Sequence, residues 1–167
     1  MKKVIKRQGM KKLLRVLMLV VLVIPFCACA DDDEYAGLTE ETKALRKKYN
    51  EKMVGDWTYE LQNERIKYYS LIHLDRKGNY TETEKVAMPH TDEQGAVTWV
   101  VEYDETSTGT WYLQYVESNK RNTFNVNMNG MIITRIFYGI HDEKLLMSTA
   151  FTAAQAAYER GTKEPSF

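Results

Sequence analysis

The sequence predicts an all-β fold, a small up-and-down antiparallel β-barrel of about eight strands with a short N-terminal helix. From Trp57 onward, apolar side chains alternate with polar ones, which is the period of a strand that buries one face. Clusters of turn-forming residues separate these runs at intervals of roughly 8–14 residues. Consecutive hairpins tend to close into a barrel, because closure leaves no strand edge exposed.

Residues 1–28 are expected to be a signal peptide and to lie outside the fold. They hold seven of the 23 basic residues of the 167-residue chain and none of its acidic ones. Val16–Ala30 is an uncharged run of 15 residues, rich in Leu and Val. A bilayer-spanning helix needs about 20 apolar residues, so this run fits the apolar part of a secretory signal better than a membrane helix.

The end of this segment resembles a bacterial lipoprotein signal, in which a small residue precedes the cysteine that receives the lipid. Cys29 follows the small Ala28. Cys27 follows the bulky Phe26, so Cys29 is the expected lipid-attachment residue and Cys27 is its competitor. Several acyl chains on one cysteine, palmitate among them, hold a protein to a membrane more firmly than one chain does. The alternatives are a cleaved signal that releases a soluble protein, and an uncleaved anchor.

The acidic run Asp31–Glu34 resembles the surface-export signal of Bacteroidetes lipoproteins, which implies an outer-membrane lipoprotein exposed at the cell surface. Residues 29–37 would then form an acidic tether. The 139 residues after position 28 hold 16 basic and 23 acidic side chains. This negative surplus argues against a nucleic-acid partner. With Cys29 as the anchor, no cysteine remains in the domain for a disulfide.

A short helix is expected over residues 38–53, ahead of a barrel domain over residues 54–167. Thr39 can cap this helix, acidic residues follow in the first turn, and lysines gather toward the end, as the helix dipole favours. The apolar stripe consists of Leu45, Tyr49 and Met53. A stripe this narrow can cover one edge or one end of a sheet but cannot form a helical core.

The strands of the barrel follow from the alternating runs. In chain order they are expected at Trp57–Leu61, Ile66–Leu74, Tyr80–Val86, Val97–Tyr103, Trp111–Tyr115, Phe124–Met128, Met131–Ile140 and Leu145–Phe151. Tyr80–Val86 is polar, as an edge strand would be. Pro89–Gly95 is expected to be a loop and Asp104–Gly109 a turn. Asn129-Gly130 favours a tight type I′ hairpin turn. Thr152–Arg160 suits either a helix or a closing strand.

Four short motifs are spread along the expected barrel. They are Gly55-Asp56-Trp57, Gly78-Asn79-Tyr80, Gly109-Thr110-Trp111 and Tyr158-Glu159-Arg160. Together they resemble the small lipocalin-like domains of bacterial lipoproteins. In that family the tryptophan of the first motif packs at the closed end of the barrel, often beneath an arginine from a late strand. The resemblance therefore implies that Trp57 plugs this end and that Arg160 caps it, with Arg135 as a rival for the cap.

Aromatic side chains are expected to converge on the barrel interior. Those on the expected inward faces are Trp57, Tyr59, Tyr68, Trp99, Tyr103, Trp111 and Tyr115. They can simply fill the core, which is favoured for a chain of this length, or they can line the mouth of a cavity for an apolar or aromatic molecule. In the second case the candidate ligand-binding residues are Tyr59, Tyr68, Trp99, Tyr103, Trp111 and Tyr115.

Neither a metal site nor a cofactor site is indicated by the sequence. The histidines, His73, His90 and His141, stand far apart and have no partner at the spacing of metal ligands. No glycine-rich phosphate loop is present. We therefore expect solvated or singly hydrogen-bonded histidines, no metal and no cofactor.

Catalytic groups are equally sparse. Glu82 with Glu84 could imitate the carboxylate pair of a glycosidase. Asp104 with Glu105 could do the same. A solvated charged face explains Glu82, Glu84 and Lys85 without any catalysis. No serine lies in the Gly-x-Ser-x-Gly motif of a hydrolase. The sequence thus favours a protein that is not an enzyme.

The leading hypothesis from the sequence is a lipid-anchored envelope protein with a lipocalin-like barrel that binds a small apolar or aromatic ligand. The runner-up is a structural or protein-interaction module with a filled barrel, which docks onto an envelope protein through an exposed edge or through residues 88–95. A hydrolase acting at the open end of the barrel is a third alternative. The expected partners are the membrane, a small apolar ligand and an envelope protein.

Overall fold

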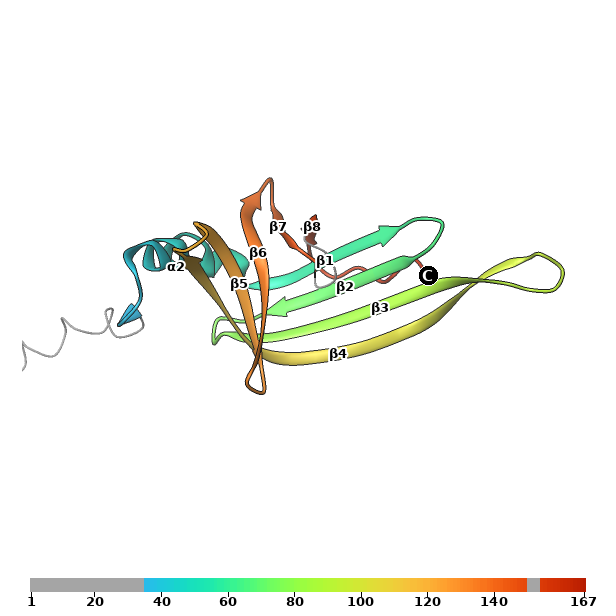
Figure 1. The fold of residues 1–167 in the computed structure, drawn as a ribbon, viewed down its shortest axis with the longest axis horizontal. Coiled ribbons are helices and arrows are strands. Elements are labelled where there is room, and N and C mark those ends of the chain that lie inside the picture. The colour runs from blue at the N-terminus through green and yellow to red at the C-terminus, as the bar shows by residue number, and fades with distance from the viewer. Residues whose placement is uncertain (1–34, 150–153) are drawn as a thin grey trace, which may run out of the picture. The chain divides into compact units, whose positions relative to one another are not determined.

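The computed structural model describes residues 35–149 and 154–167. Within these residues, helix α2 (Glu40–Met53) precedes eight antiparallel strands that form a closed barrel in chain order (Figure 1). The strands are β1 (Gly55–Gln62), β2 (Lys67–Leu74), β3 (Asn79–Thr91), β4 (Val97–Val116), β5 (Arg121–Met128), β6 (Met131–His141), β7 (Lys144–Ser148) and β8 (Gln155–Arg160). β8 returns to pair with β1. The predicted all-β barrel with one preceding helix is confirmed.

Several expectations concern residues outside the described ranges. They include the signal peptide, both cysteines and most of the tether over residues 29–37. Residues 150–153 also lie outside these ranges. They include the first two residues of Thr152–Arg160, the stretch for which the sequence left helix and strand open. Within the described part of that stretch, Gln155–Arg160 form strand β8, and its pairing with β1 closes the barrel.

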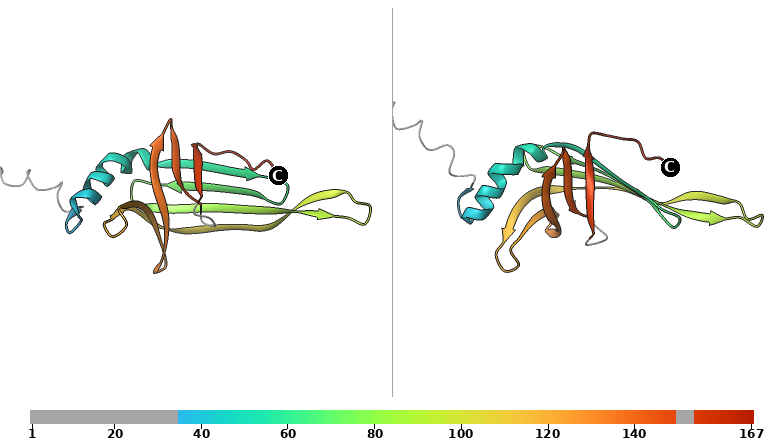
Figure 2. Two further views of the ribbon diagram at one scale, coloured as in Figure 1. Left: turned by 45° about the horizontal axis from the view of Figure 1, so that its top comes forward. Right: turned by 90° about the horizontal axis from the view of Figure 1, so that it is seen from above.

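α2 and the barrel belong to one compact unit, Thr39–Phe167, in which α2 lies across one end of the barrel (Figure 2). Thr39 caps the helix by accepting a hydrogen bond from an amide of the first turn at 3.3 Å. Met53 is fully buried, and Tyr49 packs edge-on against Phe137 of β6 with 5.0 Å between ring centres. The narrow apolar stripe of α2 therefore covers one end of the barrel.

β4 is one continuous strand where the sequence predicted two strands separated by a turn at Asp104–Gly109. That prediction was wrong. The residues of this segment are mostly polar, but they pair with β3 throughout. Thr106 Oγ1, for example, lies 2.9 Å from Thr83 Oγ1 of β3. Small polar residues are typical both of turns and of the solvent face of a strand, and composition alone does not separate the two.

β3 is longer and more central than predicted. It pairs with β2 over Tyr80–Ala87 and with β4 along its whole length, so the prediction of an edge-like strand was wrong. The loop predicted at Pro89–Gly95 is also wrong in part, because β3 continues to Thr91. The actual turn is short, and in it Asp92 Oδ1 accepts hydrogen bonds from two backbone amides at 2.8 and 2.9 Å.

From the pair of Lys67 with Ala87, where β2 begins, strands β3 and β4 continue together as a two-stranded extension, which we call the arm and define as residues 87–101. Figure 1 shows the arm reaching past the other strands. Pro89 is tolerated in the arm because no described residue of β2 pairs with β3 at that point, so the N–H that proline lacks has no ladder bond to make.

A β-bulge at the base of the arm changes which side chains face the barrel. Tyr103 and Val101 pair with consecutive residues of β3, so Glu102 is an extra residue on β4. Strict alternation predicted that Trp99 and Val101 would share the face of Tyr103. One extra residue reverses the alternation beyond it, so these two side chains turn to the opposite face.

Large apolar side chains fill the part of the barrel near α2. The fully buried ones include Trp57, Ile72, Leu74, Leu113, Phe124, Leu145, Met147 and Tyr158. Gly109 has a packing reason in this core, because a Cβ at that position would collide with the backbone oxygen of Asn127 on β5. None of the helices in the described ranges is long and apolar enough to cross a bilayer.

Candidate functional site

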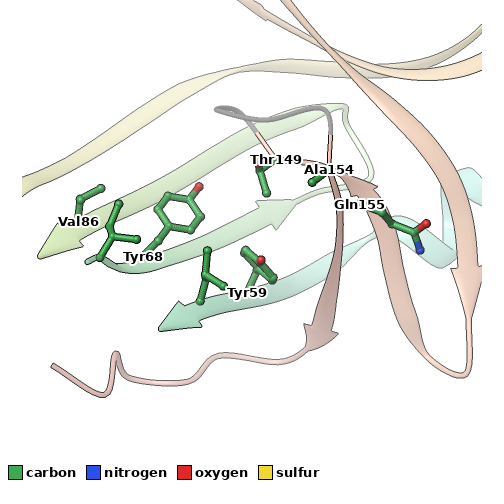
Figure 3. A pocket seen from close by; sticks show the side chains of 8 residues that line it. Tyr59, Tyr68, Val86, Thr149, Ala154 and Gln155 are labelled. Carbon is green, nitrogen blue, oxygen red and sulfur yellow. The ribbon is translucent and has the colours of Figure 1, made fainter. Parts of the chain in front are cut away.

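An apolar pocket of ≈ 520 Å³ lies beside the half of β1 that β8 does not cover. β8 pairs with β1 only at Trp57 and Thr58, so the end of β1 has no strand on that side among the described residues. The pocket is lined by Tyr59, Leu61, Ile66, Tyr68, Val86, Thr149, Ala154 and Gln155 (Figure 3). Its volume falls in the range of about 300–1,000 Å³ that is typical of small-molecule sites.

The walls of the pocket come from two parts of the barrel (Figure 3). β1, β2 and β3 supply one wall, on which Val86 and the two tyrosines lie. The other wall consists of Thr149, just after β7, and of Ala154 and Gln155 at the start of β8. The pocket is therefore built where the long strands of the sheet extend past the short ones.

Tyr59 and Tyr68 form the aromatic part of the pocket. Their ring centres are 6.0 Å apart, and Tyr59 also packs against Tyr158 at 5.2 Å. The Tyr68 hydroxyl donates a hydrogen bond to Glu84 Oε1 at 2.5 Å. Burial, together with the neighbouring phenol and carboxylates, raises the pKa of Tyr68. The phenol consequently keeps its proton and remains a donor at neutral pH.

A buried ion pair crosses the barrel next to this aromatic group. The side chains of Glu82 on β3 and Arg135 on β6 are each 3% exposed. Arg135 Nη1 donates to Glu82 Oε1 at 3.1 Å, and Nη2 donates to Oε2 at 2.5 Å, which is a bidentate arrangement. Ser70 Oγ donates to Glu82 Oε1 at 2.7 Å, and the Tyr80 hydroxyl donates to Oε2. Both carboxylate oxygens are therefore fully occupied.

The charge of Arg135 is secured by its partner. Burial by itself would lower the pKa of Arg135, but the Glu82 carboxylate and the surrounding phenols more than reverse this, so that the pKa lies above its usual value. One polar atom, Arg135 Nε, is buried without a hydrogen-bond partner. The guanidinium is thus a permanent cation that is held by Glu82 on one side.

The interpretation of Glu82, Glu84 and Lys85 as one solvated charged face was wrong. Glu82 points into the barrel and is buried, and Glu84 is half-buried on the same inward face. Only Lys85 lies on the outer face of β3, where its ammonium is 3.0 Å from Asp104 Oδ2. Every second residue of this part of β3 faces the barrel interior, namely Tyr80, Glu82, Glu84 and Val86. Two of these four residues are glutamates, so the sequence did not reveal this face of β3 as a buried one.

Glu84 is the ionisable group closest to the pocket along β3, one inward position from Val86. Burial is the main cause that raises the pKa of Glu84, and the charge of Glu82 raises it further. The hydrogen bond from Tyr68 acts in the opposite direction but does not cancel these effects. Glu84 therefore accepts a proton more readily than an exposed glutamate does.

Four of the six predicted ligand-binding residues lie outside the pocket. Two of them, Trp111 and Tyr115, have other partners. Trp111 stacks on Phe124 with 6.1 Å between ring centres and donates from Nε1 to the Asp75 carbonyl at 3.3 Å. Tyr115 is half-buried, and its backbone N–H donates to Thr42 Oγ1 of α2 at 3.1 Å. These contacts place both residues in the packing between β4 and its neighbours.

The other two lie at the base of the arm. Trp99 is turned to the outer face by the bulge, and the ammonium of Lys67 lies 4.7 Å from its ring centre. Tyr103 is half-buried and donates from its hydroxyl to Glu105 Oε2 at 3.2 Å. Of the six candidates, the structure brings only Tyr59 and Tyr68 together in the pocket.

The closed end of the barrel joins the two residues that the family resemblance singled out. Trp57 is completely buried and donates from Nε1 to the Met53 carbonyl at 2.7 Å. The guanidinium carbon of Arg160 lies 4.2 Å from the Trp57 ring centre, within the range of a cation–π contact. Arg135, the rival for this position, is instead engaged by Glu82 inside the barrel.

The histidines form separate local contacts. His73 Nδ1 lies 2.6 Å from Asp56 Oδ1, and His90 Nε2 lies 2.7 Å from Glu102 Oε1. In the part of the chain that the structure describes, no three His, Cys, Asp or Glu side chains gather in a way that could hold a metal ion.

Comparison of the chain with protein-family models, with curated proteins and with solved structures finds no match. The geometry of the pocket and of the polar network beside it is therefore the basis on which a function can be argued.

Proposed function

We propose that this chain is a lipid-anchored protein of the outer membrane, exposed at the cell surface, whose lipocalin-like barrel binds a small apolar or aromatic molecule without chemically changing it. The observation that carries the proposal is the apolar pocket of ≈ 520 Å³ lined by Tyr59 and Tyr68.

The chemistry of the pocket walls defines the class of ligand. Leu61, Ile66 and Val86 present aliphatic carbon, and the two tyrosines present aromatic rings. Burying an apolar molecule against such walls gains roughly 25 cal/mol per Å² of apolar surface removed from water. The phenol oxygens of Tyr59 and Tyr68 are polar groups on the walls that can fix the orientation of the ligand. A molecule with a ring system and one polar substituent fits this description best.

The state of the nearby ionisable groups supports binding rather than catalysis. Glu82 already accepts hydrogen bonds from three side chains, one of them a bidentate guanidinium. Glu84 Oε1 accepts a hydrogen bond from the Tyr68 hydroxyl at 2.5 Å. A general base needs a free oxygen within reach of the proton that it removes. Both oxygens of Glu82 are engaged in this way, so Glu82 acts as the structural partner of its donors.

The test is a matched pair of tryptophan substitutions, measured with the neutral apolar fluorophore N-phenyl-1-naphthylamine. Ile66→Trp places a large ring in the pocket, whereas Ile132→Trp adds the same ring at a position of β6 that is 55% exposed. The chain from residue 29 onward with Cys29→Ser avoids the need for detergent. We expect Ile66→Trp to weaken probe binding by about tenfold or more, and Ile132→Trp to leave it unchanged.

Circular dichroism of both variants establishes that the barrel has folded. Equal probe affinity in the two folded variants, or no saturable binding by the parent chain, would contradict the proposal.

A further inference from the structure

The arm leaves one long strand edge uncovered. β4 pairs with β3 from Val97 to Thr110, but it pairs with β5 only from Thr110 to Val116. Among the described residues, the other side of β4 therefore has no partner strand over residues 97–109, and Figures 1 and 2 show β4 as the outer strand there. Closed barrels normally remove such edges, because unpaired N–H and C=O groups are a template for pairing with another strand.

The backbone groups that point outward can be identified from the turn of the arm. The Asp92 N–H donates to the Ala96 carbonyl at 3.0 Å. Hydrogen-bonded and non-bonded pairs alternate along an antiparallel ladder. In the register of the arm, Thr98 and Val100 therefore bond to β3. The N–H and C=O groups that are directed away from β3 belong to Val97, Trp99 and Val101.

The two edges of the arm are unlike. On β3, Pro89 occupies an outward-directed position and has no N–H to offer, which blocks pairing at that edge. On β4, the segment Val97–Val101 contains neither proline nor charge and consists of β-branched and aromatic residues, which favour strand pairing. Val97 and Val101 are 57% and 46% exposed. The edge of β4 therefore has the composition of a strand that pairs with a further strand.

We propose that the edge of β4 pairs with the same edge of a second copy of this chain, antiparallel and with Trp99 opposite Trp99 at the two-fold axis. In this register Val97 of one copy lies opposite Val101 of the other, so every outward-directed residue meets another. Each such pair exchanges two backbone hydrogen bonds. A two-fold axis requires a self-complementary surface, and this segment is one.

The lack of charge in the pairing segment favours a second copy over a basic partner strand. Glu102 and Asp104 follow the apolar segment, but both already have cationic or hydrogen-bonding partners on β3. His90 lies 2.7 Å from Glu102, and Lys85 lies 3.0 Å from Asp104. The segment that pairs, Val97–Val101, carries no charge of its own, so within the contact it offers no ion pair to a Lys-rich or Arg-rich strand. The pairing is independent of the pocket and of the ligand proposed above.

Disulfide trapping tests both the contact and its register. The full chain is oxidised in the membranes of its own cells, and the unsubstituted chain gives the background from the natural cysteines. Residues opposite each other across paired strands have Cα atoms about 5.5 Å apart, within the reach of a disulfide. We expect Trp99→Cys to give a cross-linked dimer. Thr106→Cys, on the same edge but away from the axis, should give only background. Equal yields from the two variants would overturn the proposal.

A pair of proline substitutions tests whether the backbone edge makes the contact. Val97 and Thr91 are direct partners across the arm, and both direct their N–H groups outward, one from each edge. In the Trp99→Cys chain, adding Val97→Pro removes a donor from the β4 edge, and the cross-link should fall to background. Adding Thr91→Pro removes the matching donor from the β3 edge and should leave the cross-link intact. Loss of the cross-link with both prolines, or with neither, would refute pairing through β4.

Discussion

At the scale of single residues, the ion pair between Glu82 and Arg135 is the most unusual feature of the barrel. Removing two charges from water costs several kcal/mol for each ion, and this cost is offset only when the geometry is good and the remaining lone pairs are satisfied. The bidentate contact and the donors Ser70 and Tyr80 meet that condition for the carboxylate. The pair therefore holds β3 and β6 in a defined relation across the interior.

We predict that Arg135→Met destabilises the barrel by about 3–5 kcal/mol, because it leaves the Glu82 carboxylate buried without a cation. Adding Glu82→Gln to this variant removes the unpaired buried charge and should restore more than half of the lost free energy of unfolding. Urea unfolding followed by tryptophan fluorescence measures both effects. Arg76→Met is the control, because its ion pair with Glu51 is exposed on both sides, and it should leave the urea midpoint unchanged. A midpoint for Arg135→Met equal to that of the control would mean that the pair is not buried in solution.

The residues of the site show where sequence reasoning reached its limit. Tyr59 and Tyr68 could be predicted because aromatic residues on inward strand positions of a barrel must meet inside it. Leu61, Ile66 and Val86 share that inward face and could have been found by the same rule. Glu82 could not, because a glutamate on a polar strand is ordinarily solvated, and its partner Arg135 lies 53 residues away in the sequence. One feature of the sequence does indicate a buried cation, because Arg135 is a single arginine within the mostly apolar run of β6.

At the scale of elements, the end of α2 is attached to the barrel by side chains of two strands. Trp57 of β1 binds the Met53 carbonyl at 2.7 Å. Arg160 of β8 donates to the carbonyls of Lys52 and Val54 at 2.6 and 3.1 Å. The last carbonyls of a helix have no partner within the helix, so these contacts satisfy groups that would otherwise need water. The cation–π contact between Arg160 and Trp57 joins the two attachments into one unit.

We predict that Arg160→Leu loosens α2 without unfolding the barrel. Leucine keeps an apolar side chain over Trp57 but removes both hydrogen bonds to the helix end, each worth about 1 kcal/mol. Hydrogen exchange of the α2 amides should then quicken by about thirtyfold, while the amides of β5 and β6 keep their protection. Arg121→Leu, at an exposed position of β5, is the control and should change neither. Unchanged exchange in α2 would show that Arg160 does not hold the helix end.

The strands themselves followed from alternation wherever the alternation was uninterrupted. The pairs β1 with β2 and β5 with β6 contain no bulge, and both were predicted close to their observed bounds. β4 was misread because its polar middle resembles a turn, and Trp99 was placed on the wrong face because Glu102 interrupts the alternation. A bulge leaves no signature in composition, since it depends on how two strands pair and not on either strand alone.

At the scale of the whole molecule, the barrel brings together features that lie far apart in the sequence. The pocket joins β1 to β8, and the ion pair joins β3 to β6. The C-terminal residues after β8 run along the first two strands, where the Lys163 carbonyl accepts from the Tyr69 hydroxyl at 2.6 Å and Ser166 Oγ donates to Glu60 at 2.6 Å. Because the barrel is closed, the pocket forms only when the first strands and the last strand of the domain are both in place.

The proposed location of the molecule depends on one cysteine, and we predict that Cys29→Ala releases the protein from membranes into the soluble fraction. The physical reason is that several acyl chains, at about 0.8 kcal/mol for each buried methylene, would be the main attachment of an otherwise acidic domain. Cys27→Ala is the matched control and should leave the protein in the membrane fraction. Fractionation and immunoblotting of cells that express each variant measure the distribution. Retention of Cys29→Ala together with release of Cys27→Ala would assign the anchor to Cys27, and retention of both would refute lipid anchoring.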